Sequence, residues 1–277
     1  MTYLMDKSNK DTRLGRLDKI AFAERYPFNI PTRSYVVVHG SVYYLDHFNI
    51  ESPLSSIVTL GNGRPVSISE IDVAKDCRFL PFVSFGSNAA EDQLIRKFNV
   101  LDMKYPIFCV KGIVEDIVPV YSSHFARYGS IPATGYFEAG ARSLLFCVFL
   151  PEPLVSTMHK SEAVGSNYGF FEIEKGFSFQ DTGHINSFYG YLSLRGILRI
   201  GGDAIRLGAF SSEGSALKPM TESLVLRSVH KSIGSELGYE DFMIRILDDS
   251  QFRSEMSDRL YRATDRQENI VFARRIL

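Results

Sequence analysis

The sequence is poor in cysteine. It has three cysteines, Cys77, Cys109 and Cys147, in 277 residues. This odd, widely spaced set has the spacing of neither a zinc site nor a disulfide framework. Cys109 and Cys147 stand in apolar runs, so we expect them to be small buried hydrophobic residues in a reducing, intracellular environment.

An excess of charge of either sign is also missing. Lys and Arg number 31 against 32 Asp and Glu, for a formal net charge of −1. The basic residues form no stripe, which argues against a nucleic-acid partner. Arg274 and Arg275 are too few to change this, and we expect them to lie in a solvated terminus.

Long hydrophobic runs are absent as well. The first residues are polar from position 6 onward, without a stretch of signal-peptide type. No window approaches the roughly 18 apolar residues of a membrane span. The six histidines are scattered, without the i, i+4 pairing of metal ligands on a helix. We therefore expect a cytoplasmic protein without a metal site, in which His124, in a serine-rich loop, could approach a pocket.

The residues that are present suit a large core. Hydrophobic residues make up 45% of the chain, with 21 Phe and 14 Tyr. β-rich runs flank His39-Gly40 and predict a hairpin, and further strands are predicted over 78–85, 105–121, 133–137, 142–150 and 168–174. A second hairpin within 186–210 has Gly201-Gly202 at its tip. From Pro219 onward the pattern is helical, and strands followed by helices indicate an α+β fold.

Residues 83–95 form the segment with most chemical content. An apolar strand ends at Phe85, Gly86, Ser87 and Asn88 turn the chain, and a helix is predicted to begin after Asn88. Asn88 is a suitable N-cap, and Glu91 three residues later completes a capping-box pattern. The free N–H groups of such a turn bind anions, and Gly86 permits close approach of a ligand. By spacing alone, an ordinary strand-to-helix turn with a capping Asn is the preferred interpretation.

The segment Val83-Ser84-Phe85-Gly86-Ser87-Asn88-Ala89 resembles the signature loop of the γ-glutamylcyclotransferase-like superfamily. That family has a strand, a Tyr-Gly-Ser-Asn loop and then a helix, and Phe85 stands here in place of the tyrosine. In the family the loop holds the carboxylate or carbonyl end of a γ-glutamyl group. The resemblance implies a substrate-binding role for Phe85, Gly86, Ser87 and Asn88.

A second match lies later in the chain. Glu162, after a short predicted helix, resembles the family's catalytic glutamate, and Tyr168 resembles the tyrosine that begins the next strand. Ile131-Pro132-Ala133-Thr134 resembles the small-residue strand that lines the family's pocket. The resemblance implies that Glu162 is catalytic, that Tyr168 binds substrate, and that neither metal nor cofactor takes part. Read from the residues alone, Glu162 is a solvated glutamate at a helix end.

These observations predict one domain over residues 1–277, with a mixed sheet curled into a small barrel and helices outside. The family-like core spans about 78–210, with an N-terminal hairpin extension at about 30–50 and a C-terminal helical extension at about 215–277. The expected activity is release of 5-oxoproline from a small molecule that carries a γ-glutamyl or similar carboxylate-bearing group.

Two other functions stay open at this point: a non-catalytic binding module of the same fold, and an interaction protein that docks a partner through its C-terminal helices. The sequence leaves the oligomeric state and the leaving group undetermined. Two local features are also open. Glu115-Asp116 within a β-like run needs a turn, an edge strand or a bulge. Tyr189 and Tyr191, on one face of a strand, fit core packing or a pocket wall.

Overall fold

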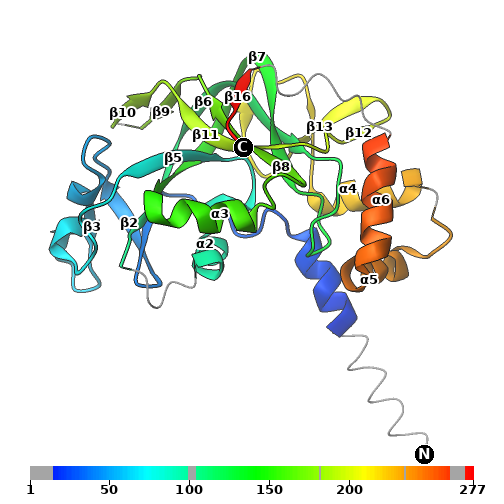
Figure 1. Cartoon of the computed structure of the whole chain (residues 1–277), viewed down its shortest axis with the longest axis horizontal. Helices are drawn as coiled ribbons and strands as arrows, with labels where there is room; N and C mark the ends of the chain where they lie inside the picture. The colour runs from blue at the N-terminus through cyan, green and yellow to red at the C-terminus, as the bar shows by residue number, and fades with distance from the viewer. Residues whose placement is uncertain (1–14, 99–103, 181, 234, 263–271) are drawn as a thin grey trace, which may run out of the picture.

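The structure is a computed structural model, and it describes residues 15–98, 104–180, 182–233, 235–262 and 272–277. A large mixed β-sheet has helices α2 and α3 on one side and the helices α4, α5 and α6 gathered at one end (Figure 1). The α+β class predicted from the sequence is thus confirmed. The division into a core and two extensions stays a prediction.

The strands are β1 (Tyr35–Val38), β2 (Ser41–His47), β3 (Ile57–Thr59), β4 (Pro65–Ser67), β5 (Phe79–Ser84), β6 (Ile107–Tyr121), β7 (Ala133–Pro151), β8 (Tyr168–Ile173), β9 (Phe177–Phe179), β10 (Gly183–Ile185), β11 (Phe188–Ser193), β12 (Arg199–Ile200), β13 (Asp203–Leu207), β14 (Ser212–Glu213), β15 (Lys218–Met220) and β16 (Ala273–Arg275). The helices are residues 15–24, α2 (Glu91–Phe98), α3 (Val155–Ser161), α4 (Glu222–Ile233), α5 (Tyr239–Asp248) and α6 (Ser250–Arg262). Single 3₁₀ turns are η1 (Pro53–Ser55), η2 (Ile68–Glu70), η3 (Ser87–Ala89) and η5 (Glu152–Leu154).

The long antiparallel pair β6 and β7 forms the centre of the sheet. The sequence predicted two strands over 133–137 and 142–150, and this was wrong, because β7 is continuous. The pairing register shifts between the pairs Glu115–Arg142 and Ile117–Phe137, where residues 138–141 of β7 are unpaired. The unpaired residue on β6 is Asp116, which adopts a φ of 59°. Its carboxylate accepts a hydrogen bond from the Gly140 N–H at 2.8 Å, so both strands bend together.

The sheet is open, which corrects the predicted barrel. Its main path runs β16-β8-β11-β5-β7-β6-β1-β2-β3-β4, and among the described residues the end strands β16 and β4 do not pair with each other. The backbone of β6 pairs with the short strands β1, β9 and β13 at separate segments on the side away from β7. Because three short strands share this edge, no single strand returns to close the sheet.

The predicted hairpin at His39-Gly40 is confirmed, and so is the predicted tip at Gly201-Gly202. The second hairpin is shorter than predicted, because β11 pairs with β8 and β5 and only β12 pairs with β13. His39 and Gly40, with φ values of 48° and 76°, join β1 to β2 through the two-residue turn that suits the twist of a hairpin. Gly201-Gly202 joins β12 to β13 in the same way. Because β1 also pairs with β6, the N-terminal hairpin is part of the same sheet as the central strands.

The apolar faces of the C-terminal helices are buried. Val225 and Val229 of α4 and Phe242 and Ile246 of α5 have no exposed surface. These stripes belong to the core, so they do not offer the exposed docking surface that the interaction-protein alternative requires. None of the helices in the described part of the chain is long and apolar enough to cross a membrane.

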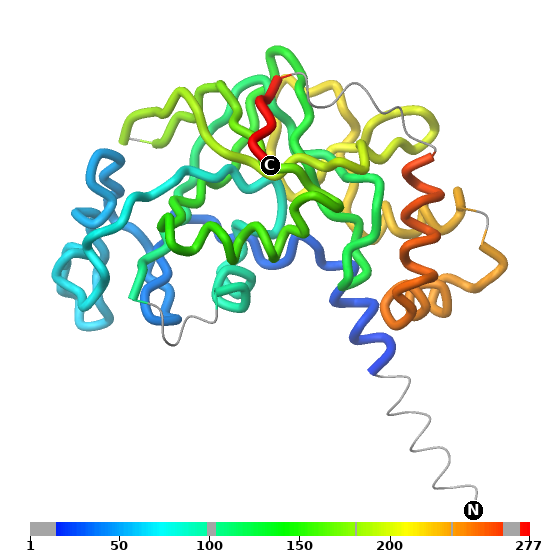
Figure 2. The backbone as a smooth tube through the Cα atoms, in the orientation of Figure 1, coloured from blue at the N-terminus to red at the C-terminus, as the bar shows by residue number. Residues whose placement is uncertain are grey.

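Both ends of the described chain are part of the folded structure. A helix at residues 15–24, which the sequence analysis did not predict, leads to Tyr26, which is buried. At the other end, β16 pairs with β8, and Arg274 forms an ion pair with Glu172. Arg274 and Arg275 are exposed, as expected, but they lie on a strand, which is drawn in red in Figure 2.

Candidate functional site

The loop after β5 is a tight 3₁₀ turn. The Ser84 hydroxyl donates a hydrogen bond to the Gly86 carbonyl at 3.0 Å, and the Ala90 N–H donates one to the Ser87 carbonyl at 3.0 Å. Ala90 is extended, so α2 begins only at Glu91. The predicted N-cap at Asn88 and its capping box were therefore wrong. The physical reason is that the Asn88 side chain is bonded to other side chains across the pocket.

The loop keeps three free backbone donors. Within the described residues, the N–H groups of Gly86, Ser87 and Asn88 make no hydrogen bond. Gly86 is buried, while Ser87 and Asn88 are half-buried. A cluster of unpaired N–H groups beside a cavity is suited to an anionic oxygen.

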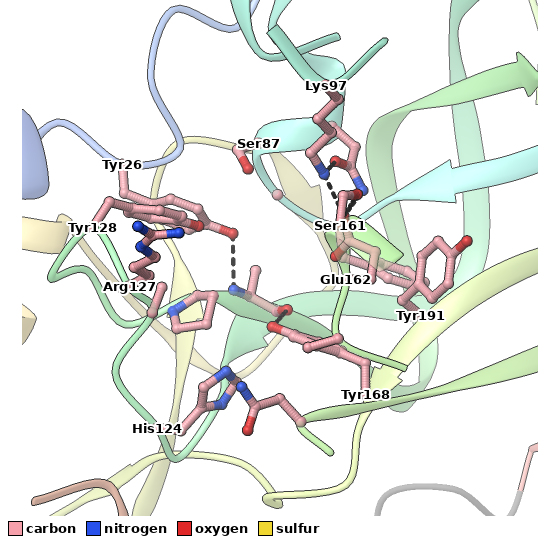
Figure 3. A pocket seen from close by; sticks show the side chains of 18 of the residues that line it. Tyr26, Ser87, Lys97, His124, Arg127, Tyr128, Ser161, Glu162, Tyr168 and Tyr191 are labelled. Carbon is pink, nitrogen blue, oxygen red and sulfur yellow. Dashed lines mark hydrogen bonds and ion pairs between the residues drawn. The ribbon is translucent and has the colours of Figure 1, made fainter. Parts of the chain in front are cut away.

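Glu162 meets this loop although it lies 74 positions away from Asn88 in the chain. It follows the last residue of α3, and its side chain is only 14% exposed. Oε1 accepts a hydrogen bond from the Asn88 Nδ2 at 3.2 Å and forms an ion pair with Lys97 of α2. Lys97 also donates to the Asn88 Oδ1, which closes a triangle of three side chains (Figure 3). The reading of Glu162 as a solvated glutamate is therefore wrong.

Two tyrosines hold the strand β7 at the floor of the pocket. The Tyr168 hydroxyl donates to the Ala133 carbonyl at 2.9 Å, and the Ala133 N–H donates to the Tyr26 hydroxyl oxygen at 2.9 Å. The rings of Tyr26 and Tyr128 stack beside them, with centroids 6.2 Å apart. Burial raises the pKa of Tyr128 and Tyr168, and the charge of Glu162 adds to this. These hydroxyls are therefore neutral hydrogen-bonding groups.

Gly86 has no room for a side chain. A Cβ atom there would lie 2.0 Å from the Tyr26 hydroxyl oxygen and 3.2 Å from the Ala133 Cβ. The N-terminal segment thus passes directly against the loop, and only glycine permits this approach.

Phe85 is buried beneath the same loop, at 4% exposure. Its ring occupies the space where side chains on Gly135 of β7 and Gly190 of β11 would lie. These two glycines in strand interiors leave the room that the ring fills. Phe85 therefore anchors the loop to the sheet through packing.

Loop, glutamate and tyrosines line one cavity of about 500 Å³, a size suited to a small molecule. Its lining includes four basic side chains, Arg96, Lys97, Arg127 and Lys160, against the single carboxylate of Glu162. Because Lys97 is paired with Glu162, the remaining positive charge favours an anionic ligand. Pro132 and Ala133 also line it, as the family resemblance implied, and Tyr191 forms part of the wall.

The cavity thus contains all six residues that the sequence singled out: Phe85, Gly86, Ser87, Asn88, Glu162 and Tyr168. Sequence reasoning missed Tyr26, Lys97, Arg127 and Tyr128. No local signal marks them, because they come from a helix exit, a helix face and an irregular loop. Among the described residues, no group of three or more His, Cys, Asp or Glu side chains is placed to hold a metal ion.

Glu222, the first residue of α4, lies behind the pocket floor. It is 1% exposed; its Oε1 accepts a hydrogen bond from the Ile131 N–H at 2.6 Å, while Oε2 has no hydrogen-bond partner in the described chain. Burial raises the pKa of this carboxyl well above its ordinary value, despite the opposing effect of the Ile131 bond. The folded protein therefore holds Glu222 in its protonated form at a pH where the unfolded chain ionises it.

This linkage predicts that Glu222→Gln stabilises the protein at neutral pH. The stability associated with the protonated carboxyl is fully present below the unfolded pKa of about 4.3 and falls as the pH rises toward the raised folded pKa. A neutral amide removes this loss, so the free energy of unfolding should increase by roughly 1 kcal/mol or more at pH 7. Urea denaturation at pH 4 and pH 7 checks this. An equal effect of the substitution at both pH values would contradict it.

Comparisons with known proteins give low similarity. No protein-family model matches the chain, and no curated protein does. Among solved structures, the chain is similar to a "Gamma-glutamyl cyclotransferase", with 13% identity and a TM-score of 0.35, over 68% of this chain and 100% of that one. It is also similar to an uncharacterized protein from Homo sapiens, with 12% identity and a TM-score of 0.35, over 65% of this chain and 98% of that one. Because these identities and TM-scores are low, we infer the function from the geometry of the cavity.

Proposed function

We propose that this protein is an enzyme that releases 5-oxoproline from a γ-glutamyl amide or amine, with Glu162 as the catalytic acid and base. The observation that carries the proposal is the 3.2 Å contact between Asn88 of the loop and the carboxylate of Glu162 in one cavity. A loop with free N–H groups and a largely buried acid face the same small space. The loop and glutamate also match the motifs of the γ-glutamylcyclotransferase-like superfamily.

In the proposed reaction the α-amine of the substrate attacks its own γ-carbonyl carbon. A new C–N bond closes the five-membered ring, and the bond from the carbonyl carbon to the leaving nitrogen breaks. The α-amine loses a proton and the leaving nitrogen gains one, so a single carboxylate that takes and then returns the proton serves both steps. The products are 5-oxoproline and the free amine, and no cofactor is needed.

Glu162 has one oxygen available for this role. The contacts of Asn88 and Lys97 are both made to Oε1. Among the described residues Oε2 has no hydrogen-bond partner, so it is the atom we assign to proton transfer. Lys97 holds the carboxylate in a fixed orientation beside the loop, which supplies part of the positioning that catalysis requires.

The charge of the cavity suits both polar groups on the α-carbon of the γ-glutamyl group. The basic side chains and the free N–H groups of Gly86, Ser87 and Asn88 favour its α-carboxylate. The same positive charge disfavours the protonated α-ammonium group and so favours the neutral amine that must attack. Phe85 lacks a hydroxyl, but its ring packs against glycines of the sheet and anchors the loop without that group.

The direct test is incubation of the purified protein with γ-glutamyl amino acids and γ-glutamyl amides, with detection of 5-oxoproline by mass spectrometry. We expect time-dependent 5-oxoproline together with an equal amount of the free amine. Absence of product from a broad panel would overturn the proposal.

A second candidate, a non-catalytic binding module, is favoured by one observation: the carboxylate of Glu162 forms an ion pair with Lys97. If the pair is permanent, the cavity binds carboxylates without turnover. In that case glutamyl compounds raise the thermal midpoint while no 5-oxoproline forms, and a thermal-shift assay run beside the activity assay separates the two functions.

A further inference from the structure

The hydroxyl of Tyr26 is a polar group of the cavity that has no part in the proposed proton transfer. Tyr26 lines the cavity and is 6% exposed. It lies outside the family-like core predicted at about 78–210, and it reaches the pocket from the exit of the helix at residues 15–24. Figure 3 shows its hydroxyl pointing into the cavity from the side opposite Glu162.

Within the protein, the Tyr26 hydroxyl acts as an acceptor. It accepts a hydrogen bond from the Ala133 N–H at 2.9 Å, and it donates none to the residues that the structure describes. A tyrosine hydroxyl also has a proton to donate, and burial raises the pKa of Tyr26 well above its ordinary value, so the oxygen keeps that proton at neutral pH. A buried donor is costly to leave without an acceptor, and a ligand oxygen in the cavity can supply one.

The same hydroxyl lies against the loop that follows β5. A Cβ atom on Gly86 would be 2.0 Å from the Tyr26 oxygen, so the lack of a side chain at Gly86 lets this oxygen approach the loop backbone. The loop carries the free N–H groups of Gly86, Ser87 and Asn88. Phe85 brings no hydroxyl to the loop, whereas Tyr26 does. One O–H and three N–H donors thus lie together, and a carboxylate, with about four acceptor sites, can accept from several of them.

Buried contacts hold Tyr26 in this position. Ala23, three residues earlier, is fully buried, and its carbonyl accepts a hydrogen bond from the Ser130 hydroxyl at 2.7 Å. The Tyr26 ring stacks on Tyr128, and Phe28 meets it edge to face with centroids 5.8 Å apart. Because the ring is packed by both neighbours, the hydroxyl is positioned before a ligand binds, which reduces the entropy lost on binding.

We propose that the Tyr26 O–H donates a hydrogen bond to the α-carboxylate of the γ-glutamyl group, so that the N-terminal segment completes the carboxylate site of the 86–88 loop. The inference rests on the proposed function, which supplies the identity of the ligand. Tyr26 is then a substrate-binding residue. Its bond to the carboxylate is present both before and during ring closure, so loss of the hydroxyl should raise KM more than it lowers kcat.

The experiment measures the binding of two ligands that cannot cyclise, because both lack the α-amine. Glutaryl-alanine keeps the carboxylate of the γ-glutamyl group, and butanoyl-alanine differs from it only in lacking that carboxylate. By calorimetry, we expect the wild-type protein to bind glutaryl-alanine more tightly. Tyr26→Phe should raise the Kd of glutaryl-alanine by about tenfold or more, the effect of one hydrogen bond to a charged group, and leave that of butanoyl-alanine unchanged.

The matched control is Tyr121→Phe, which should leave the ratio of the two Kd values unaltered. Tyr121 is also buried and its hydroxyl donates to the Met220 carbonyl at 3.0 Å, but it lies outside the cavity lining. Thermal midpoints define a temperature at which every variant is folded, and all Kd values are measured there. Steady-state kinetics of Tyr26→Phe with γ-glutamyl-alanine give the separate effects on KM and kcat.

A purely structural role for Tyr26 would weaken both ligands equally. An equal change of this kind, an unchanged ratio in Tyr26→Phe, or a wild-type protein without a preference for glutaryl-alanine would overturn the inference. The Kd values do not depend on turnover. If γ-glutamyl-alanine and the other γ-glutamyl compounds yield no 5-oxoproline, the proposed function fails separately, and the ratio of Kd values still decides the role of Tyr26.

Discussion

Replacing Glu162 with glutamine is expected to lower kcat/KM for 5-oxoproline release by about 10²- to 10⁴-fold, the range for loss of a general acid–base group. Glutamine keeps the size of the side chain and an oxygen that can accept from Asn88, but it cannot take a proton from the α-amine. Steady-state rates with γ-glutamyl-alanine measure the effect. Full activity in Glu162→Gln would remove this residue from the mechanism.

Stability has to be separated from catalysis in this variant. The Lys97 side chain is 10% exposed, so removal of its partner leaves a nearly buried cation without compensation, and this destabilises a folded protein. The double variant Glu162→Gln/Lys97→Met removes both charges and should regain thermal stability while it stays inactive. Glu152→Gln is the matched control, because Glu152 is exposed at the start of η5 and lies outside the cavity lining.

Gly86→Ala is expected to destabilise the protein by about 1–3 kcal/mol and to reduce activity, because the added methyl group overpacks a full site. Its Cβ would lie 2.0 Å from the Tyr26 hydroxyl oxygen, which itself accepts from the Ala133 N–H. Relief of the clash must move either the loop or the N-terminal segment. Urea denaturation gives the change in the free energy of unfolding, and the activity assay reports the displacement of the loop.

A double-mutant cycle with Tyr26→Phe tests this cause directly. Without the hydroxyl, the nearest Tyr26 atom would be Cζ at 3.0 Å, so Gly86→Ala should cost less in the Tyr26→Phe background. Tyr26→Phe alone loses the acceptor for the Ala133 N–H and should be destabilising. Gly61→Ala serves as the control, because a Cβ there meets nothing within 4 Å. Equal costs in both backgrounds would show that the contact with Tyr26 is not the cause.

The tyrosines and basic residues around Glu162 also bear on the choice between enzyme and binding module. Neutral hydroxyls from Tyr26 and Tyr168 are already bonded to the backbone of Ala133, so they hold the floor of the pocket. The carboxylate of Glu162, paired with Lys97 beside the loop, is the group to which we assign proton transfer. The Glu162→Gln variant therefore tests directly whether this carboxylate takes part in catalysis.

Local sequence patterns determined several elements correctly. The β-rich runs around His39-Gly40 and Gly201-Gly202 specify hairpins, because residues in those turns adopt positive φ values. The bulge at Asp116 was one of three readings of an acidic pair inside an apolar strand. The strand and turn at 85–88 were predicted from local pattern, but the roles of that loop and of Glu162 were inferred from the family resemblance.

Only the tertiary structure decided how these segments meet. The sheet stays open because the far edge of β6 is divided among β1, β9 and β13, and strand pairing of this kind depends on register between distant segments. Asn88 faces Lys97 and Glu162 instead of capping α2, and Tyr26 closes the pocket from the N-terminal segment. The sequence by itself determined the shape of the backbone at several turns and strands. The convergence of these side chains on one cavity was decided by long-range packing, which no local spacing encodes.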